Sequence, residues 1–113
     1  MATTIQLGGK ERELRFTYMS MKSLEAHYGK SIQRVFDEDF KDGGLDSVTM
    51  LLWACLRKEK LTVAKIDQLI EDSIETEEIT MKDIGDKLKV AIENSKVVKG
   101  IKADEQGDDE AKN

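Results

Sequence analysis

The chain has 113 residues, of which 39% are hydrophobic and 36% are charged, and its formal net charge at pH 7 is −5. This length predicts one small domain, and this composition is typical of a globular protein with a heavily solvated surface. The acidic balance argues against nonspecific nucleic-acid binding, which needs a basic excess, and no apolar run approaches the roughly 20 residues that cross a bilayer. We therefore expect neither a nucleic acid nor a membrane as a partner.

The single cysteine, Cys55, bears on the cellular compartment. One cysteine cannot form an intrachain disulfide, so a reducing cytoplasm is the setting that we expect. The first four residues, Met1 to Thr4, carry neither the basic region nor the apolar region of an export signal.

The first third of the chain predicts a β-hairpin that leads into a short helix. Residues 5–7 and 13–17 each alternate apolar and polar side chains, and residues 8–11 lie between them as the turn. The spacing of apolar residues then becomes helical, with Ser20 as the expected N-cap and Gly29 as the expected left-handed residue at the C-terminal end.

A second and a third helix follow the first. Ser31 can cap a short helix, and residues 42–44, Asp-Gly-Gly, form the clearest loop of the chain. The third helix is expected from Asp46 or Ser47 to about Lys60. Its main apolar stripe comprises Val48, Leu51, Leu52, Cys55 and Leu56. Few positions before Arg57 are polar, so this helix is either central or shared with a partner.

Two threonines mark the starts of the last two helices. Thr62 is expected to cap a fourth helix and Thr80 a fifth, where Asp83 can complete a capping box. The periodicity stops at about residue 99. We therefore expect an α+β fold in residues 1–98, mostly α-helical, with an N-terminal β-hairpin followed by about five short helices, and a disordered acidic tail in residues 99–113.

No pattern in the chain points to catalysis or to a metal. Cys55 and the single histidine, His27, could form a pair, but a small buried hydrophobe and an exposed helix residue are the simpler interpretation. The acidic residues 37–42 lack the ligand spacing of a calcium loop. The glycine pairs at 8–9 and 43–44 are too short to cradle a phosphate. We expect no enzyme activity, no metal and no cofactor.

One stripe of the third helix has two interpretations. Met50, Trp53 and Arg57 fall at steps of three and four, so they share a face of the helix. This face is either a second buried surface of a central helix or a contact with another protein. The interpretation as a protein contact is supported by the enrichment of Met, Trp and Arg at interface centres. These three residues are our candidate partner-binding residues.

Three blocks of sequence between Ile5 and about Ile92 carry a family resemblance. They are Ile5-x-Leu7-Gly8-Gly9-Lys10 with Glu13-Leu14-Arg15-Phe16-Thr17 and Met21-x-x-Leu24-Glu25-x-x-x-Gly29-Lys30-Ser31-Ile32, then Leu51-Leu52-x-Ala54-Cys55-Leu56-Arg57, and finally Leu61-Thr62 with Ile66-Asp67-x-Leu69-Ile70-Glu71. In order and spacing they resemble the tail assembly chaperones of long-tailed bacteriophages and prophages. Ala64 stands where family members often have an acidic residue, a difference that affects the start of a helix.

The resemblance implies a non-enzymatic factor for virion assembly. Such chaperones bind the tape measure protein, keep it soluble and help to recruit tail tube subunits around it. They act in the host bacterial cytoplasm, are absent from the mature virion, and form homo-oligomers. Many are made in a short form and in a longer form that arises by ribosomal frameshifting. Residues 111–113, Ala-Lys-Asn, can be encoded by a slippery run of adenines, so we expect the chain to be the short form.

The alternative is a small helical regulatory or adaptor protein, such as a DNA-binding factor. A recognition helix rich in Arg, Lys, Asn and Gln would favour it, and none is apparent. Two isolated strands are marginal in water and leave open edges, so we also expect a strand-to-strand contact between subunits.

Overall fold

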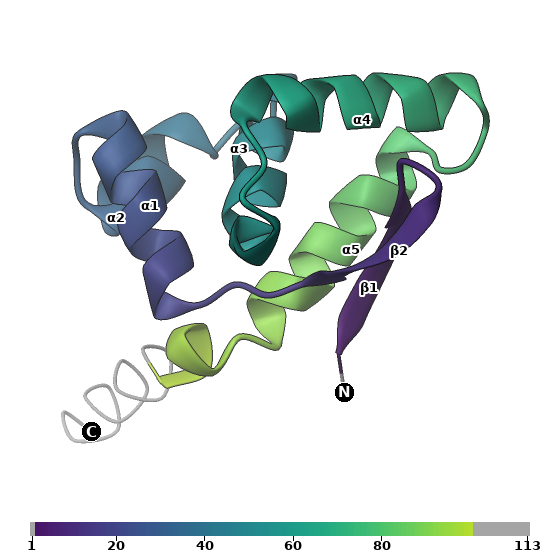
Figure 1. Cartoon of the computed structure of the whole chain (residues 1–113). Coiled ribbons are helices and arrows are strands. Elements are labelled where there is room, and N and C mark those ends of the chain that lie inside the picture. The colour runs from purple at the N-terminus through teal and green to yellow at the C-terminus, as the bar shows by residue number, and fades with distance from the viewer. Residues whose placement is uncertain (1, 101–113) are drawn as a thin grey trace, which may run out of the picture.

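The computed structural model describes residues 2–100 and consists of a two-stranded antiparallel hairpin followed by helices α1 to α5 (Figure 1). The elements are β1 (Thr3–Leu7), β2 (Lys10–Leu14), α1 (Tyr18–Tyr28), α2 (Ile32–Arg34), α3 (Leu45–Cys55), α4 (Val63–Glu75) and α5 (Met81–Glu93). A π-helical turn spans Val35–Asp39 and a 3-10 turn spans Arg57–Glu59. The predicted fold class, a hairpin followed by about five helices, is confirmed.

The hairpin turn is tighter than the sequence indicated. Only Gly8 and Gly9 form it, both with positive φ (65° and 80°), and Leu7 pairs directly with Lys10. This backbone suits a two-residue turn whose twist matches that of the strands. The second strand therefore covers residues 10–14 and not 13–17. The prediction was wrong because it treated Arg12 as a turn neighbour, whereas this residue lies on the inner face of the hairpin.

The inner face of the hairpin packs on the helices. Ile5, Leu7 and Leu14 are buried on this face. Arg12 is buried beside them, and its guanidinium is paired with Glu59 and donates from Nε to the carbonyl of Leu7 at 2.7 Å. Helix α5 lies along β1, while α3 contacts β2 (Figure 1). The hairpin and the C-terminal helix thus share one core.

The N-cap of helix α1 lies three residues before the predicted one, Ser20. Thr17 is the N-cap, and it forms a reciprocal capping box with Ser20. Residues 15–17 are therefore a linker between β2 and α1 and not part of a strand. Gly29 ends the helix in the left-handed conformation (φ 70°), and Ser31 caps α2, both as predicted.

Helix α3 is the central element, and it is shorter than predicted. It ends at Cys55, after which the 3-10 turn closes at Lys60 with a positive φ of 55°. Burial extends around more of its surface than one stripe. The buried positions are Ser47, Thr49, Met50, Leu52, Ala54 and Cys55. Val48 and Leu51, expected inside, are half-buried.

The last two helices begin at the predicted caps. Thr62 accepts a hydrogen bond from the N–H of Lys65, and Thr80 forms the predicted capping box with Asp83. Residues 96–100 are helical, so residues 99 and 100, which were predicted to belong to the tail, are part of a helix. The rest of that prediction, residues 101–113, lies outside the described residues. Within residues 2–100 no helix is both long and apolar enough to cross a membrane.

Candidate partner-binding surface

The structure separates the three residues of the predicted contact stripe. Met50 is 1% exposed and belongs to the core, which corrects its assignment as a partner-binding residue. The helix packs on α1, α4 and α5, so the Met50 side chain has no route to the surface. Trp53 is half-buried and Arg57 is exposed, and the Arg57 Nε donates to the Ser23 hydroxyl at 2.8 Å. Two of the three candidates remain at the surface.

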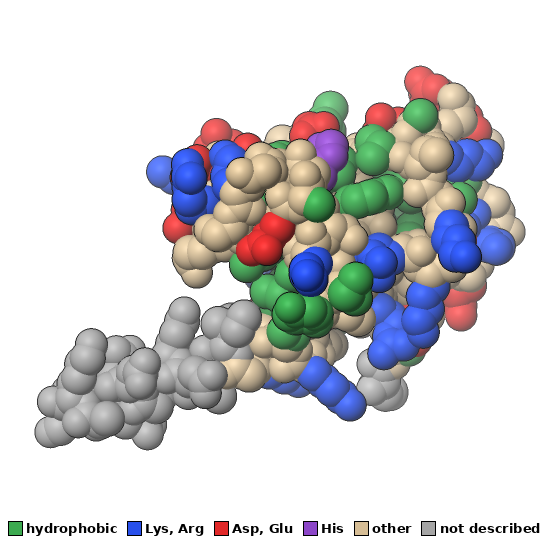
Figure 2. Space-filling model, turned by 60° about the vertical axis from the view of Figure 1, so that its left-hand side comes forward, with side chains coloured by type: hydrophobic (Ala, Val, Ile, Leu, Met, Phe, Trp, Pro, Cys, Tyr) green, Lys and Arg blue, Asp and Glu red, His purple; other side chains and the backbone are tan. Residues whose placement is uncertain are grey.

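Trp53 lies beside His27, which projects from α1. The two ring centroids are 6.2 Å apart and the planes are tilted by 50°. Figure 2 shows hydrophobic side chains next to His27, which is drawn in purple. A second hydrophobic area lies lower on the same face, bordered by Lys and Arg side chains.

A continuous series of aromatic rings leads inward from this surface. The consecutive pairs are Trp53–His27, His27–Tyr28, Tyr28–Phe40, Phe40–Phe36 and Phe36–Phe16. Four of these pairs meet edge to face, the arrangement that ring quadrupoles favour. The series ties α1 to the π-helical turn, and it ends at Phe16 in the β2–α1 linker. Packed aromatic rings therefore contact the linker at Phe16.

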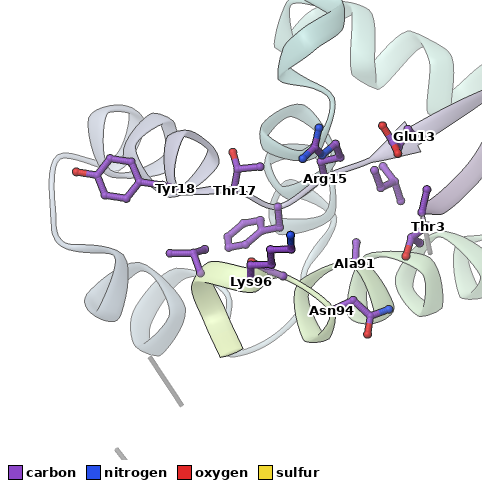
Figure 3. Close-up of a pocket in the computed structure, with 13 residues that line it drawn as sticks. Thr3, Glu13, Arg15, Thr17, Tyr18, Ala91, Asn94 and Lys96 are labelled. Carbon is purple, nitrogen blue, oxygen red and sulfur yellow. The ribbon is translucent and has the colours of Figure 1, made fainter. Parts of the chain in front are cut away.

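Phe16 also lines a surface hollow formed by the described residues. This groove has a volume of about 470 Å³ and runs between the linker and the C-terminal end of α5 (Figure 3). Its walls come from the start of β1, from the end of β2 through Tyr18, and from Ala91 through Val97. The groove exists because the two strands end at Thr3 and Leu14 while the chain continues, extended, to Thr17.

The groove combines an apolar base with cationic walls. Phe16 and Ala91 are buried at its base, whereas Tyr18 is 62% exposed at its mouth. Figure 3 shows Arg15 on the linker side and Lys96 on the opposite side. Neither cation has a carboxylate within 4.0 Å among residues 2–100. One carboxylate, that of Glu13, also lines the groove.

A smaller hollow of about 190 Å³ lies on the other side of the same linker. Arg15 and Thr17 line both hollows, and Arg57 from the predicted stripe lines the smaller one together with Lys58. Cys55 lies at its base, where burial raises the pKa of the thiol to about 12. The thiol is therefore protonated at neutral pH. This burial agrees with the predicted structural role of Cys55.

Other shifted pKa values belong to the π-helical turn and its neighbours. Hydrogen bonds from Arg34 and Lys30 lower the pKa of Glu38 to about 2. Burial, together with the charges of Asp46 and Asp39, raises the pKa of Tyr28 to about 12. Tyr28 itself belongs to the aromatic series, and none of these groups lines either hollow.

The chemistry-bearing residues of the sequence stay apart from one another. His27 is exposed on α1 while Cys55 is buried at the end of α3, as predicted. Within residues 2–100, no three His, Cys, Asp or Glu side chains cluster in a way that would hold a metal ion. What the described residues present is a binding geometry: two hollows beside a linker and an aromatic surface.

Comparisons with known proteins add no assignment, since no family model, no curated protein and no solved structure matches the chain. Sequence reasoning missed the groove residues Arg15, Tyr18 and Lys96. Arg15 had been placed in a strand, and Lys96 had no expected neighbour. Nothing in the sequence distinguished Tyr18, because its 62% exposure at the mouth of the groove depends on how the linker and α5 pack.

Proposed function

We propose that this chain is an assembly chaperone of a long-tailed phage or prophage, which binds the tape measure protein, keeps it soluble and helps to recruit tail tube subunits. It would act in the host bacterial cytoplasm, without a cofactor, and be absent from the mature virion. Support comes from the three sequence blocks that resemble this family. The structural observation that favours it most is the aromatic-lined groove on an otherwise charged exterior.

The groove has the chemistry that such a client requires. A tape measure protein exposes long apolar helical faces until the tube covers them, and a chaperone must cover these faces without aggregating itself. Phe16, Tyr18 and Val97 offer apolar contact, and Arg15 and Lys96 would select for acidic residues that flank the apolar face. The aromatic surface at Trp53 and Arg57 offers a second contact area.

Self-association is part of the same proposal. In the part of the chain that the structure describes, β1 and β2 form a sheet of two strands, so each strand has an outer edge without a strand partner. Open edges favour pairing with another chain. We expect a homo-oligomer in which such edges meet. Light scattering at high protein concentration tests this, and a strictly monomeric protein would contradict it.

The decisive experiment is co-expression with a tape measure protein, followed by pull-down from the soluble fraction. The tape measure protein should become soluble and co-purify with this chain. If it stays insoluble and unbound with this chain, and also with a frameshifted longer form, the proposed function is wrong. Salt-dependent binding to DNA in the same preparation would instead support the adaptor alternative.

A matched pair of variants connects the function to the groove. Tyr18→Ser removes an apolar side chain at the mouth of the groove, whereas Leu45→Ser removes one that is 73% exposed at the start of α3, away from both hollows. Both variants should fold, because surface changes of this kind alter stability by about 0.5 kcal/mol or less. Only Tyr18→Ser should weaken co-purification. Equal effects of the two changes would exclude the groove as the contact site.

Trp53→Ala tests the aromatic surface separately. A stable variant that loses the client or its oligomeric state places Trp53 in an interface. A variant that unfolds places Trp53 in the core, since truncation of a packed Trp costs about 3–5 kcal/mol. The Trp53 side chain is half-buried and contacts His27, so the variant can show both a loss of stability and a loss of binding. The Tyr18→Ser result does not depend on the outcome at Trp53.

A further inference from the structure

The groove lies next to the point where the described chain ends. Lys96 and Val97 line it, and the helical residues 96–100 lead directly from it to residue 101. Thirteen residues of sequence follow Gly100. At about 3.3–3.6 Å per extended residue, a segment of this length reaches any point of the groove. Residues 101–113 are therefore long enough to reach Arg15.

The charges of the groove and of the following segment are complementary. Residues 102–113 contain five carboxylates, Asp104, Glu105, Asp108, Asp109 and Glu110, against two lysines, a net charge of −3. The groove presents Arg15 and Lys96 against one carboxylate, that of Glu13, and neither cation has a carboxylate within 4.0 Å among residues 2–100. Lys99 is exposed between the two. Attraction between opposite charges a few ångströms apart favours contact at ordinary ionic strength.

We propose that the acidic segment 102–113 of this same chain occupies the groove, with its carboxylates at Arg15 and Lys96. A tethered segment is present at an effective concentration in the millimolar range, which favours it over the same segment of a second copy in dilute solution. Charge complementarity and the covalent tether therefore favour the acidic segment of the same chain as the occupant of the groove. This inference goes beyond the proposed function and does not depend on it.

One consequence does rest on the proposed function. A client that uses the groove must displace the acidic segment, so its apparent affinity is lowered by the fraction of molecules in which the segment is docked. Neutralising the segment should then tighten client binding. The same contact would shield Phe16 and Tyr18 from other copies until a client arrives.

Disulfide trapping in the full-length protein tests the contact directly. Asn94→Cys places a thiol in the groove and Asp108→Cys places one in the acidic segment, while the native Cys55 is buried. The control pairs Asp108→Cys with Lys87→Cys, an exposed position of α5 outside the groove. The control loop is longer, which by itself slows closure about twofold, so we expect the groove pair to cross-link at least about fivefold faster.

Salt separates docking from chance encounters. In about 1 M salt the Debye length falls to about 3 Å, so the ratio of the two rates should collapse to the twofold set by loop length. A ratio of two at low salt as well would overturn the proposal. Cross-links that join two chains and disappear on dilution would also overturn it, since the occupant would then be a second copy.

Charge exchange provides a second, independent measurement. Arg15→Glu with Lys96→Glu should abolish the preferential cross-link, and adding Asp104→Lys with Asp109→Lys should restore it. Lys87→Glu with Lys89→Glu, two exposed positions on α5 outside the groove, is the control and should change nothing. Failure of the restored pair to cross-link in a folded protein would contradict pairing of these charges.

Discussion

The two ends of the hairpin are held in different ways. At the closed end, the Gly8 N–H donates to the Ser73 hydroxyl at 2.8 Å, and the Gly9 N–H donates to the Glu78 carboxylate at 2.9 Å. Leu69 packs so closely that a Cβ at Gly8 would overlap its Cδ2 atom. The turn is thus fixed to the end of α4 and to the segment that follows it.

The open end is held by contacts with the end of α3. The Arg15 N–H donates to the carbonyl of Cys55 at 3.1 Å, and the Ser20 hydroxyl donates to the carbonyl of Ala54 at 2.9 Å. Between these bonds and α5 lies the groove. One end of a small hairpin can thus secure the fold while the other end borders a groove, so substitutions at the two ends should have different consequences.

The largest effect is expected at the closed end. Gly8→Ala should lower the free energy of unfolding by about 2–3 kcal/mol, because it adds a clash with Leu69 to the strain of a positive φ. Gly9→Ala is the matched control, since its φ is also positive but a Cβ there meets nothing within 4 Å. It should cost only about 1 kcal/mol. Urea unfolding with an unchanged m value measures both, and equal losses would show that the clash is relieved at no cost.

The next effect concerns the hydroxyl that receives the turn. Ser73→Ala should cost about 1 kcal/mol, because it removes the buried hydroxyl that accepts the part-buried hydrogen bond from the Gly8 N–H. Thr76→Ala removes an exposed hydroxyl from the same stretch of chain and should cost less than about 0.5 kcal/mol. The two are compared by thermal or urea unfolding. A Ser73 variant as stable as the Thr76 variant would mean that the closed end is not clamped.

The ionisation of Cys55 at alkaline pH tests whether the open end excludes solvent from the thiol. Its pKa is raised from 9 to about 12 by burial, so its contribution to stability is complete below pH 9 and is lost as the pH rises toward 12. By pH 10 this loss amounts to about 1 kcal/mol relative to Cys55→Ala measured at the same pH values. Urea unfolding between pH 8 and 10 gives the two slopes. Parallel slopes would show that the open end admits solvent to the thiol.

The smallest effect is expected within the groove itself. Arg15→Ala and Lys96→Ala should each change the free energy of unfolding by about 0.5 kcal/mol or less, since neither side chain has an ion-pair partner among residues 2–100. A loss above 1 kcal/mol at either position would remove the contrast between the two ends and assign the groove a structural role.

Caps and glycines made most of the fold predictable from the sequence. Gly29, Ser31, Thr62 and Thr80 end or begin helices where local hydrogen bonding dictates. Errors arose where a tertiary contact decides: Arg12 is inside the hairpin because Glu59, distant in sequence, pairs with it.

The candidate site was harder to predict. Met50, Trp53 and Arg57 share a helical face, but periodicity cannot tell which part of that face the neighbouring helices cover. The groove was invisible for the same reason, since its walls come from both ends of the chain. Only the packing of α5 beside the linker brings Lys96 opposite Arg15.

The pairing of the first strand with the last helix also constrains synthesis. Ile5 and Leu7 leave the ribosome early, yet they are buried only after α5 has followed. At synthesis rates of about 5–20 residues per second, roughly 4–17 s pass between the synthesis of the hairpin and that of α5. During that interval the apolar inner face of the hairpin is exposed on every polysome that translates the message.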